Sequence, residues 1–376
     1  MKRACAALAL GAALSVAPTA AQATPAAPGP GPSAQARVGG PPVLAYYYIW
    51  FNATSWNRAK RDWPLVGRYS SDESSVMRAH VRAAKAAGIT GFLVSWKDTP
   101  QLDERLAALV AVAREEQFTL GVVYQGLDVR REPLPVARVE HDMAAFAERW
   151  GSDPVFHVFD QPLMVWAGTW RFTAQEVAQV SHAVSSDLAL LGSERDEKRW
   201  GELGGLLDGN AYYWSSQDPQ KDLRGLQRLA RMSVAVHATG DLWVAPATPG
   251  FDARLNAGSR VVDRRGGQTL RDTWAVALGS SPDAVGLISW NEFTENTHVE
   301  PSEAYGDSTL RTLASLTGTP GPQGDLDSSS SPEEGPSNAP RVLAVGGLML
   351  ALAGGVVRRA HRGDPHDGAP YPGASR

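Results

Sequence analysis

Between residues 41 and 316, short apolar runs alternate with amphipathic stretches, a pattern typical of βα units around a parallel sheet. The eight apolar runs are 43–50, 88–96, 118–124, 162–167, 188–192, 209–214, 242–247 and 285–290. Helical periodicity fills the gaps at 74–87, 102–116, 139–149, 174–185, 221–239 and 269–278. Eight strands predict a single α/β domain, a closed (β/α)8 TIM barrel. An open doubly wound sheet is the alternative, but no glycine-rich phosphate loop follows any run.

The two ends of the chain differ in composition from the middle. Residues 1–23 join a basic start to an Ala/Leu-rich run and a small-residue Ala-Gln-Ala site, which predicts a cleaved secretory signal peptide. Residues 317–340 are rich in Gly, Pro, Ser and Asp and predict a disordered, flexible linker. We expect the apolar run 342–357 to form a C-terminal transmembrane helix, although it is shorter than the about 20 residues of a usual span; the alternative is a loosely associated hydrophobic tail. The short basic tail 358–376 would then be cytoplasmic and the barrel, 41–316, extracellular and anchored to the membrane.

Composition excludes several partners and chemistries. The formal net charge of -4 gives no support to nucleic-acid binding. Cys5, the only cysteine, lies inside the predicted signal peptide, which excludes thiol catalysis and thiolate metal sites in the exported protein. No pair of histidines has the spacing of metal ligands, so we predict neither a metal nor a cofactor. His80 lies in an apolar helical stretch, where we expect it to form structural hydrogen bonds.

Two glutamates, Glu292 and Glu295, directly follow the last apolar run. In a parallel barrel, residues just past a buried strand point into the active site. Two carboxyl groups held close together in a partly dry cleft cannot both ionise easily, so one keeps a proton near neutral pH and can act as a general acid. Trp290 and Phe293 would supply apolar surface around them. The alternative is that Asn291 and Glu292 cap the following turn and that Glu295 is solvated.

Polar and aromatic residues also collect at the ends of the other apolar runs. Sugar rings present apolar C–H faces and a rim of hydroxyl groups, so such a set of side chains suits a carbohydrate. The predicted substrate-binding residues are Tyr46, Tyr48, Trp50, Trp96, Asp98, Tyr124, Gln125, Asp128, Tyr212, Trp290, Asn291 and His298. His298 could hydrogen-bond the substrate or Glu300. For any single aromatic residue, the alternative is a place in the core or on the rim.

Four stretches, in order, resemble glycoside hydrolase family 99, the endo-α-mannosidases and endo-α-mannanases, and its looser relatives. They are 46–50, 64–72 together with His80 and 87–96, 249–252, and 289–301. The last is the most specific, since family members carry an Asn-Glu-Trp-x-Glu-Gly-Thr-x-Ile-Glu-Pro pattern there. The resemblance spans most of residues 43–310. It implies a (β/α)8 barrel that cleaves an α-linked, mannose-containing glycan, with Glu295 as general acid/base and Glu292 binding and polarising the substrate.

The chain departs from the family pattern at three positions. Family members are thought to retain anomeric configuration through the sugar's own 2-hydroxyl, assisted by a separate carboxylate after the third strand. Gln125 stands where we expect that carboxylate, and an amide cannot accept the proton. Phe293 and Asn296 replace the usual Trp and Gly. Three explanations stay open: Asp128 or Asp98 substitutes, the two glutamates perform a direct displacement, or the site binds glycan without cleaving it.

The sequence therefore predicts an exported, membrane-anchored glycoside hydrolase whose partner is an oligo- or polysaccharide. A non-catalytic, cell-surface glycan-binding protein on a hydrolase-like barrel is the alternative. A third possibility is a surface structural protein without a ligand, in which the Trp side chains are buried in the core rather than lining a cleft.

Overall fold

Eight parallel strands close into a barrel in the order β1-β10-β7-β6-β5-β4-β3-β2. A computed structural model of the 376-residue chain describes residues 40–256 and 258–322. The barrel strands are β1 Val43–Tyr48, β2 Gly91–Trp96, β3 Thr119–Gln125, β4 Leu163–Ala167, β5 Ala189–Gly192, β6 Gly209–Ala211, β7 Leu242–Ala247 and β10 Ala284–Leu287. Each of the eight predicted runs overlaps one of these strands, so the predicted (β/α)8 barrel is confirmed.

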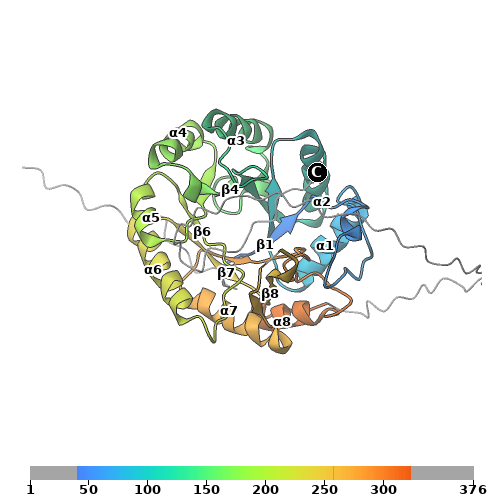
Figure 1. The fold of residues 1–376 in the computed structure, drawn as a ribbon. Coiled ribbons are helices and arrows are strands. Elements are labelled where there is room, and N and C mark those ends of the chain that lie inside the picture. Colours follow the sequence, from blue (N-terminus) through green and yellow to red (C-terminus); the bar gives the residue numbers. More distant parts are fainter. Residues whose placement is uncertain (1–39, 257, 323–376) are drawn as a thin grey trace, which may run out of the picture. The chain divides into compact units, whose positions relative to one another are not determined.

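Helices surround the strands, as the view along the barrel in Figure 1 shows. They are α1 Ser74–Ala86, α2 Pro100–Glu116, α3 Val136–Trp150, α4 Ala174–Val184, α5 Glu197–Leu203, α6 Leu223–Thr239, α7 Gln268–Gly279 and α8 Ser308–Thr317. Six of them were predicted, whereas α5 and α8 were not. A small antiparallel pair, β8 Phe251–Asp252 and β9 Val261–Val262, adds to the loop after β7.

Local sequence explains where several helices begin. Thr173 and Glu176 form a capping box at the start of α4, in which each side chain accepts a hydrogen bond from the other residue's backbone N–H. The Thr99 side chain caps α2, whose first residue is Pro100. The Asp196 carboxylate caps α5 by accepting from the Lys198 and Arg199 amides, which allows a short helix in a charged segment.

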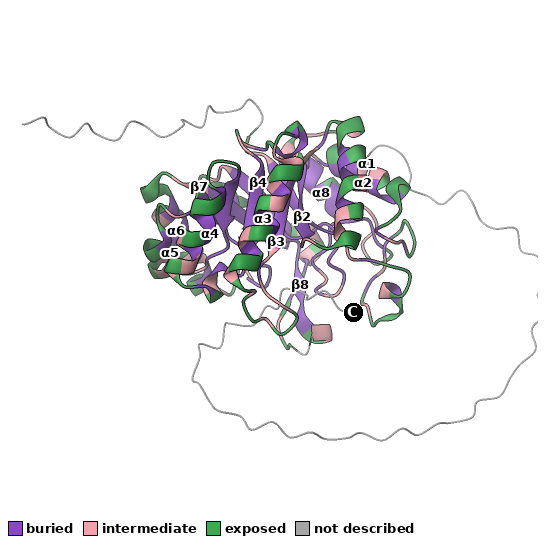
Figure 2. Ribbon diagram, turned by 90° about the horizontal axis from the view of Figure 1, so that it is seen from above, coloured by how far each residue is buried: buried purple, intermediate pink, exposed green. Residues whose placement is uncertain are grey.

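Side chains alternate between the two surfaces of the barrel wall. Leu44, Tyr46, Leu93 and Val123 belong to a cluster that fills the barrel interior. Their neighbours along the strands, such as Tyr47, join the larger cluster between strands and helices. This alternation follows from the two-residue period of a strand. Figure 2 shows buried strands behind helices whose outer faces are exposed.

The packed body continues a few residues past its predicted end at residue 316. The Thr317 and Thr319 hydroxyls donate hydrogen bonds to the Ala87 and Ala86 carbonyls, both at 3.1 Å. No helix among the described residues is long and apolar enough to cross a membrane. The predicted signal peptide, most of the predicted linker, the predicted membrane helix at 342–357 and the tail all lie outside those residues.

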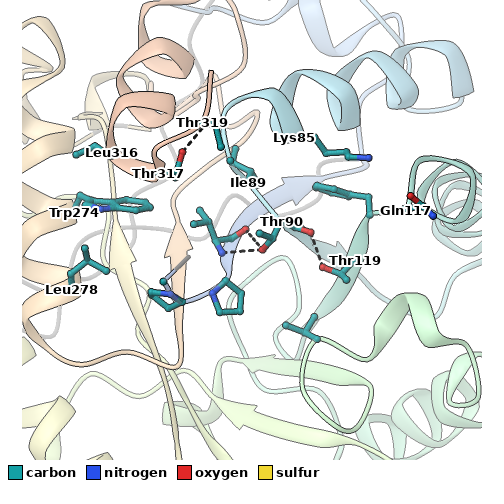
Figure 3. Close-up of a pocket in the computed structure, with 17 residues that line it drawn as sticks. Lys85, Ile89, Thr90, Gln117, Thr119, Trp274, Leu278, Leu316, Thr317 and Thr319 are labelled. Atoms are coloured by element: carbon teal, nitrogen blue, oxygen red, sulfur yellow. Dashed lines mark hydrogen bonds between the residues drawn. The ribbon is translucent and has the colours of Figure 1, made fainter. Parts of the chain in front are cut away.

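A cavity of about 660 Å³ lies at the N-terminal ends of β1, β2 and β3 (Figure 3). The Thr90 hydroxyl bonds to the Val43 amide at 3.0 Å, and the Thr119 hydroxyl donates to the Thr90 carbonyl at 2.8 Å. Trp274 and Leu316 form part of its apolar wall. In TIM barrels, this end contributes to stability, whereas active sites lie at the C-terminal ends of the strands.

Candidate functional site

After β10, residues 289–299 fold back into a tight loop at the C-terminal end of the barrel. The Ser289 amide donates to the Thr297 carbonyl at 3.0 Å, and the two hydroxyl groups of these residues lie 3.0 Å apart. Asn296 has a φ of 54°, in the left-handed region that glycine and, among other residues, asparagine adopt most readily. This conformation explains why Asn296 can stand where the family pattern has Gly.

Glu295 is completely buried in this loop. Neither of its carboxylate oxygens has a hydrogen-bond partner within residues 40–256 and 258–322. Burial raises the pKa of Glu295 well above its usual value, and the nearby charge of Glu292 raises it further, whereas the charge of Arg131 lowers it. The side chain is thus a buried carboxyl group that favours its protonated form, rather than a solvated residue.

Glu292 is also buried, but more of its neighbours stabilise its ionised form. Burial raises its pKa, while the Thr294 amide, which donates to Oε1 at 2.8 Å, and the Lys60 ammonium group both lower it. The Glu292 amide in turn donates to the Ser289 hydroxyl at 2.9 Å. Both pKa values are raised, but that of Glu295 is raised further, so Glu292 is the member of the pair that ionises first and Glu295 the one that keeps its proton.

Asn291 fixes the position of this loop relative to β1. Its Oδ1 accepts from the Tyr48 amide at 2.9 Å, and its Nδ2 donates to the Tyr48 carbonyl at 3.0 Å. Nδ2 also donates to the Tyr69 hydroxyl at 3.1 Å. The Asn291 side chain is therefore occupied by contacts within the protein, so it positions the carboxylate loop.

Three tyrosines lie on the inner side of the barrel near these carboxylates. The Tyr48 and Tyr213 hydroxyls are 3.0 Å apart, and the Tyr46 and Tyr213 rings meet edge to face at 4.9 Å. Burial raises the pKa of Tyr48, and the charges of Glu292 and Glu295 raise it further. The partly exposed ring of Trp50 stacks on Tyr48 at 4.3 Å. The structure thus brings the predicted residues Tyr46, Tyr48 and Trp50 together, and it adds Tyr213.

Four predicted substrate-binding aromatics lie instead between the strands and the helices. They are Trp96, Tyr124, Tyr212 and Trp290, none more than 1% exposed. Trp96 Nε1 donates to Asp103 and the Tyr124 hydroxyl donates to Asp142, both at 2.9 Å. The expectation that these four side chains meet at the carboxylates has to be corrected, because each points to the outer surface of the barrel wall.

The polar residues expected after β2 and β3 serve mainly their own loops. Gln125 has the inward orientation of Val123, two residues earlier, and its Nε2 donates to the Ser95 hydroxyl at 3.1 Å. Asp128 Oδ1 accepts from the Arg130 and Glu132 amides at 2.8 and 2.9 Å, which fixes the turn after β3.

Asp98 lies in a cluster of charged residues formed with helices α2 and α3. Burial raises its pKa, and Asp103 and Asp142 raise it further. Ligand atoms of Asp98, His141 and Asp142 lie within 4.8 Å of one another. Asp142, however, already pairs with Arg138 at 2.5 Å, and we assign no metal to this group.

His298 hydrogen-bonds to Asp62, and not to Glu300 as expected. Its Nε2 lies 2.9 Å from Asp62, and its ring stacks on Phe293 at 4.1 Å. Burial and the nearby Arg264 lower its pKa to about 4, although Asp62 opposes this change. The imidazole is therefore neutral at pH 7, with the Nε2 proton donated to Asp62. The expected contact with Glu300 is replaced by this buried pair.

Glu300 belongs instead to a hydrogen-bond network that includes His80. His80 Nε2 lies 3.0 Å from Glu300 Oε1, and His80 Nδ1 lies 3.0 Å from the Tyr47 hydroxyl. The Tyr69 hydroxyl donates to Glu300 Oε2 at 3.0 Å. The structural role predicted for His80 is confirmed, and the network connects α1 to the loop after β10.

The sequence matches no family profile and no curated protein. Solved structures do match it. A GH99 endo-α-mannosidase from Bacteroides thetaiotaomicron in complex with bis-tris-propane has a TM-score of 0.64 at 19% identity, over 73% of this chain and 96% of that chain. A second structure of that endo-α-mannosidase gives 0.63 at 18%, with the same coverage. A glycoside hydrolase-like protein gives 0.58 at 15%, over 73% and 93%. At these identities the likeness shows the fold, so the described chain has the same barrel fold as the GH99 endo-α-mannosidases that its motifs resemble.

Proposed function

We propose that this protein is a glycoside hydrolase that cleaves an α-linked, mannose-containing glycan. The observation that carries the proposal is the unequal pair of buried carboxyl groups, Glu292 and Glu295, on the loop after the last barrel strand. Perturbed carboxyl groups at the C-terminal end of a barrel are typical of catalytic acids and bases. The fold shared with the GH99 endo-α-mannosidases supports the same assignment.

In this proposal, Glu295 is the general acid. It donates its proton to the glycosidic oxygen as the bond to the leaving sugar breaks, and it takes a proton back from the water whose oxygen bonds to the anomeric carbon. Its raised pKa keeps that proton available near neutral pH. Glu292, held by the Thr294 amide, is the ionised partner that polarises the substrate. This assignment uses both carboxylates of the loop and needs none at Gln125.

Gln125 favours a second candidate, a protein that binds glycan without cleaving it. Its amide donates to Ser95 and cannot act as a base. Replacing Gln125 with Glu separates the two possibilities. If Glu292 assists Glu295 as proposed, Gln125→Glu gives no gain in rate. If the missing carboxylate is what prevents cleavage, the same variant creates activity in an inactive protein.

The test is product release by the full chain from a panel of α-mannans and other α-glucans. We expect release by the wild type and a loss of about 10²- to 10⁴-fold in Glu295→Gln, the usual contribution of a general acid. Glu303→Gln is the matched control, since Glu303 is exposed in the next loop. Absence of release from every glycan, with calorimetric binding of one retained, would refute hydrolysis and support glycan binding.

We also propose that the protein is exported and anchored to the membrane with its barrel outside. The support comes from the sequence, namely the signal-like residues 1–23 and the apolar run 342–357 with a basic cluster after it. Cell fractionation and protease treatment of intact cells test this. Protection of the barrel from external protease, or its recovery without membranes, would contradict the anchored arrangement.

A further inference from the structure

A second cavity lies between the beginnings of α7 and α8, where its lining includes residues of both helices. Its volume is about 240 Å³, several times the roughly 30 Å³ that one water occupies in the liquid. The lining includes Arg264, Arg265, Tyr305, Ser308 and Thr309. In many TIM barrels, the loops after the last two strands and a helix N-terminus bind phosphate groups.

Arg264 is the buried cation of this cavity. Only 8% of the residue is exposed, and within the described chain no carboxylate lies within ion-pair distance of it. Nη1 donates to the Thr309 hydroxyl at 3.2 Å, and Nη2 donates to the Asn296 and His298 carbonyls. Nε has no acceptor among the described residues. The guanidinium plane lies over the Tyr305 ring at 4.0 Å.

Burial costs Arg264 part of its preference for the charged form. Its pKa falls to about 10, mainly through burial, although Tyr305 and, beyond His298, Asp62 favour the charge. A cation held among neutral groups is better stabilised when an anion lies beside it. The unused Nε–H is the kind of donor that an oxyanion accepts.

Two helix N-termini border the same cavity. The N-cap residues of α7 and α8, Gly267 and Asp307, form no side-chain capping hydrogen bond. The helix dipoles therefore add positive potential at the cavity, which attracts an anion as the charge of Arg264 does. Arg265 also lines it but pairs with Asp272 at 2.8 Å, and Asp263 is the one carboxylate in the lining. Because Arg265 is paired, Arg264 and Asp263 balance in formal charge, and the two helix N-termini supply the remaining positive potential of the cavity.

We propose that this cavity binds a tetrahedral oxyanion, phosphate or sulfate, either free or as an ester on a sugar. The inference is independent of the proposed hydrolysis, since none of the cavity residues belongs to the carboxylate pair. Because Arg264 holds the Asn296 and His298 carbonyls, an anion in the cavity also reinforces the loop that carries Glu295.

The test is calorimetric titration of the full chain with inorganic phosphate, with sodium chloride at matched ionic strength as the reference. Ser308 is exposed at the first position of α8 and lines the cavity. Ser308→Asp adds an anion there without harm to the helix, because acidic residues stabilise a helix N-terminus. We expect it to weaken phosphate binding at least about tenfold. Ser308→Lys should strengthen binding.

Ser74→Asp is the matched control. Ser74 is exposed at the first position of α1 and does not line the cavity, so the substitution makes the same change of charge at another helix start. It should leave phosphate affinity within about twofold. Titration with mannose 6-phosphate distinguishes a sugar ester from the free ion, since tighter binding of the ester identifies the glycan source. No phosphate binding beyond that of chloride, or equal weakening by Ser74→Asp and Ser308→Asp, would overturn the proposal.

Discussion

The hydroxyl groups of Tyr48 and Tyr213 lie 3.0 Å apart inside the barrel and join the chain at the end of β1 to the chain after β6. Both glutamates of the carboxylate loop influence the pKa of Tyr48. The Tyr124 side chain lies on the outer surface of the barrel wall, where its hydroxyl donates to Asp142 among the helices. Substitutions of Tyr48 and Tyr124 therefore test the inner and the outer surface of the barrel wall separately.

We predict that Tyr48→Phe lowers kcat/KM about three- to tenfold on any glycan that the wild type cleaves, because one hydrogen bond of the site is lost. Tyr124→Phe should leave kcat/KM within about twofold. It should instead lower the free energy of unfolding by about 1 to 3 kcal/mol, because buried Asp142 loses a donor. Steady-state kinetics and urea unfolding of both variants check this. A larger kinetic effect of Tyr124→Phe would place that side chain against the substrate after all.

Glu295→Gln should stabilise the protein while it removes activity. The folded protein keeps the Glu295 proton to a pH well above 4.5, whereas the unfolded chain releases it near 4.5. The native state is therefore increasingly disfavoured as the pH rises above 4.5, until Glu295 ionises in the fold. Glutamine has no proton to release, so the melting temperature of the variant should exceed that of the wild type, with a gap that grows from pH 4.5 toward neutrality. A constant gap, or one shared by Glu303→Gln, would argue against a protonated Glu295.

The network around His80 makes a prediction about stability. His80→Ala removes the contacts with Glu300 and Tyr47, both buried, and leaves the Glu300 carboxylate with fewer donors. The free energy of unfolding should fall by about 2 to 4 kcal/mol. His182→Ala, on the exposed face of α4, should change it by no more than about 0.5 kcal/mol. Urea denaturation of the two variants side by side measures the difference, and similar values would mean that the network contributes little.

The sequence predicted the strands and the carboxylate loop because both depend on local order along the chain. Each barrel strand is a short apolar run between helical stretches, and Glu292 and Glu295 follow the last run directly. The helices α5 and α8 were missed. Helix α5 lies in a charged, glycine-containing segment where the capping carboxylate of Asp196 is the main signal.

The surface of the barrel wall toward which each aromatic side chain points could not be predicted in the same way. A strand of a parallel barrel is apolar on both surfaces, so its composition does not show which residues point inward. Tyr212 and Tyr213 are adjacent and both buried, yet Tyr213 is the one inside the barrel. Position relative to an inward neighbour, such as Ala211, is the signal that identifies Tyr213. His298 was misplaced for another reason, since its partner Asp62 is distant in sequence.

His298 gives a pH dependence that can be isolated by one substitution. Its pKa is about 4 in the fold, against 6.5 ordinarily, so the unfolded chain takes up a proton between these values while the folded protein does not. Stability from this group is therefore complete above pH 6.5 and falls by about 3 kcal/mol as the pH drops to 4.

His298→Gln keeps an N–H for Asp62 but cannot titrate. The lowered pKa of Asp62 acts below its ordinary value of 3.8, outside this interval, and the glutamate pair affects wild type and variant alike. The difference in unfolding free energy between wild type and His298→Gln should therefore shift by about 3 kcal/mol between pH 6.5 and 4, in favour of the variant at low pH. A difference that stays constant across this interval would show that His298 titrates normally in the fold.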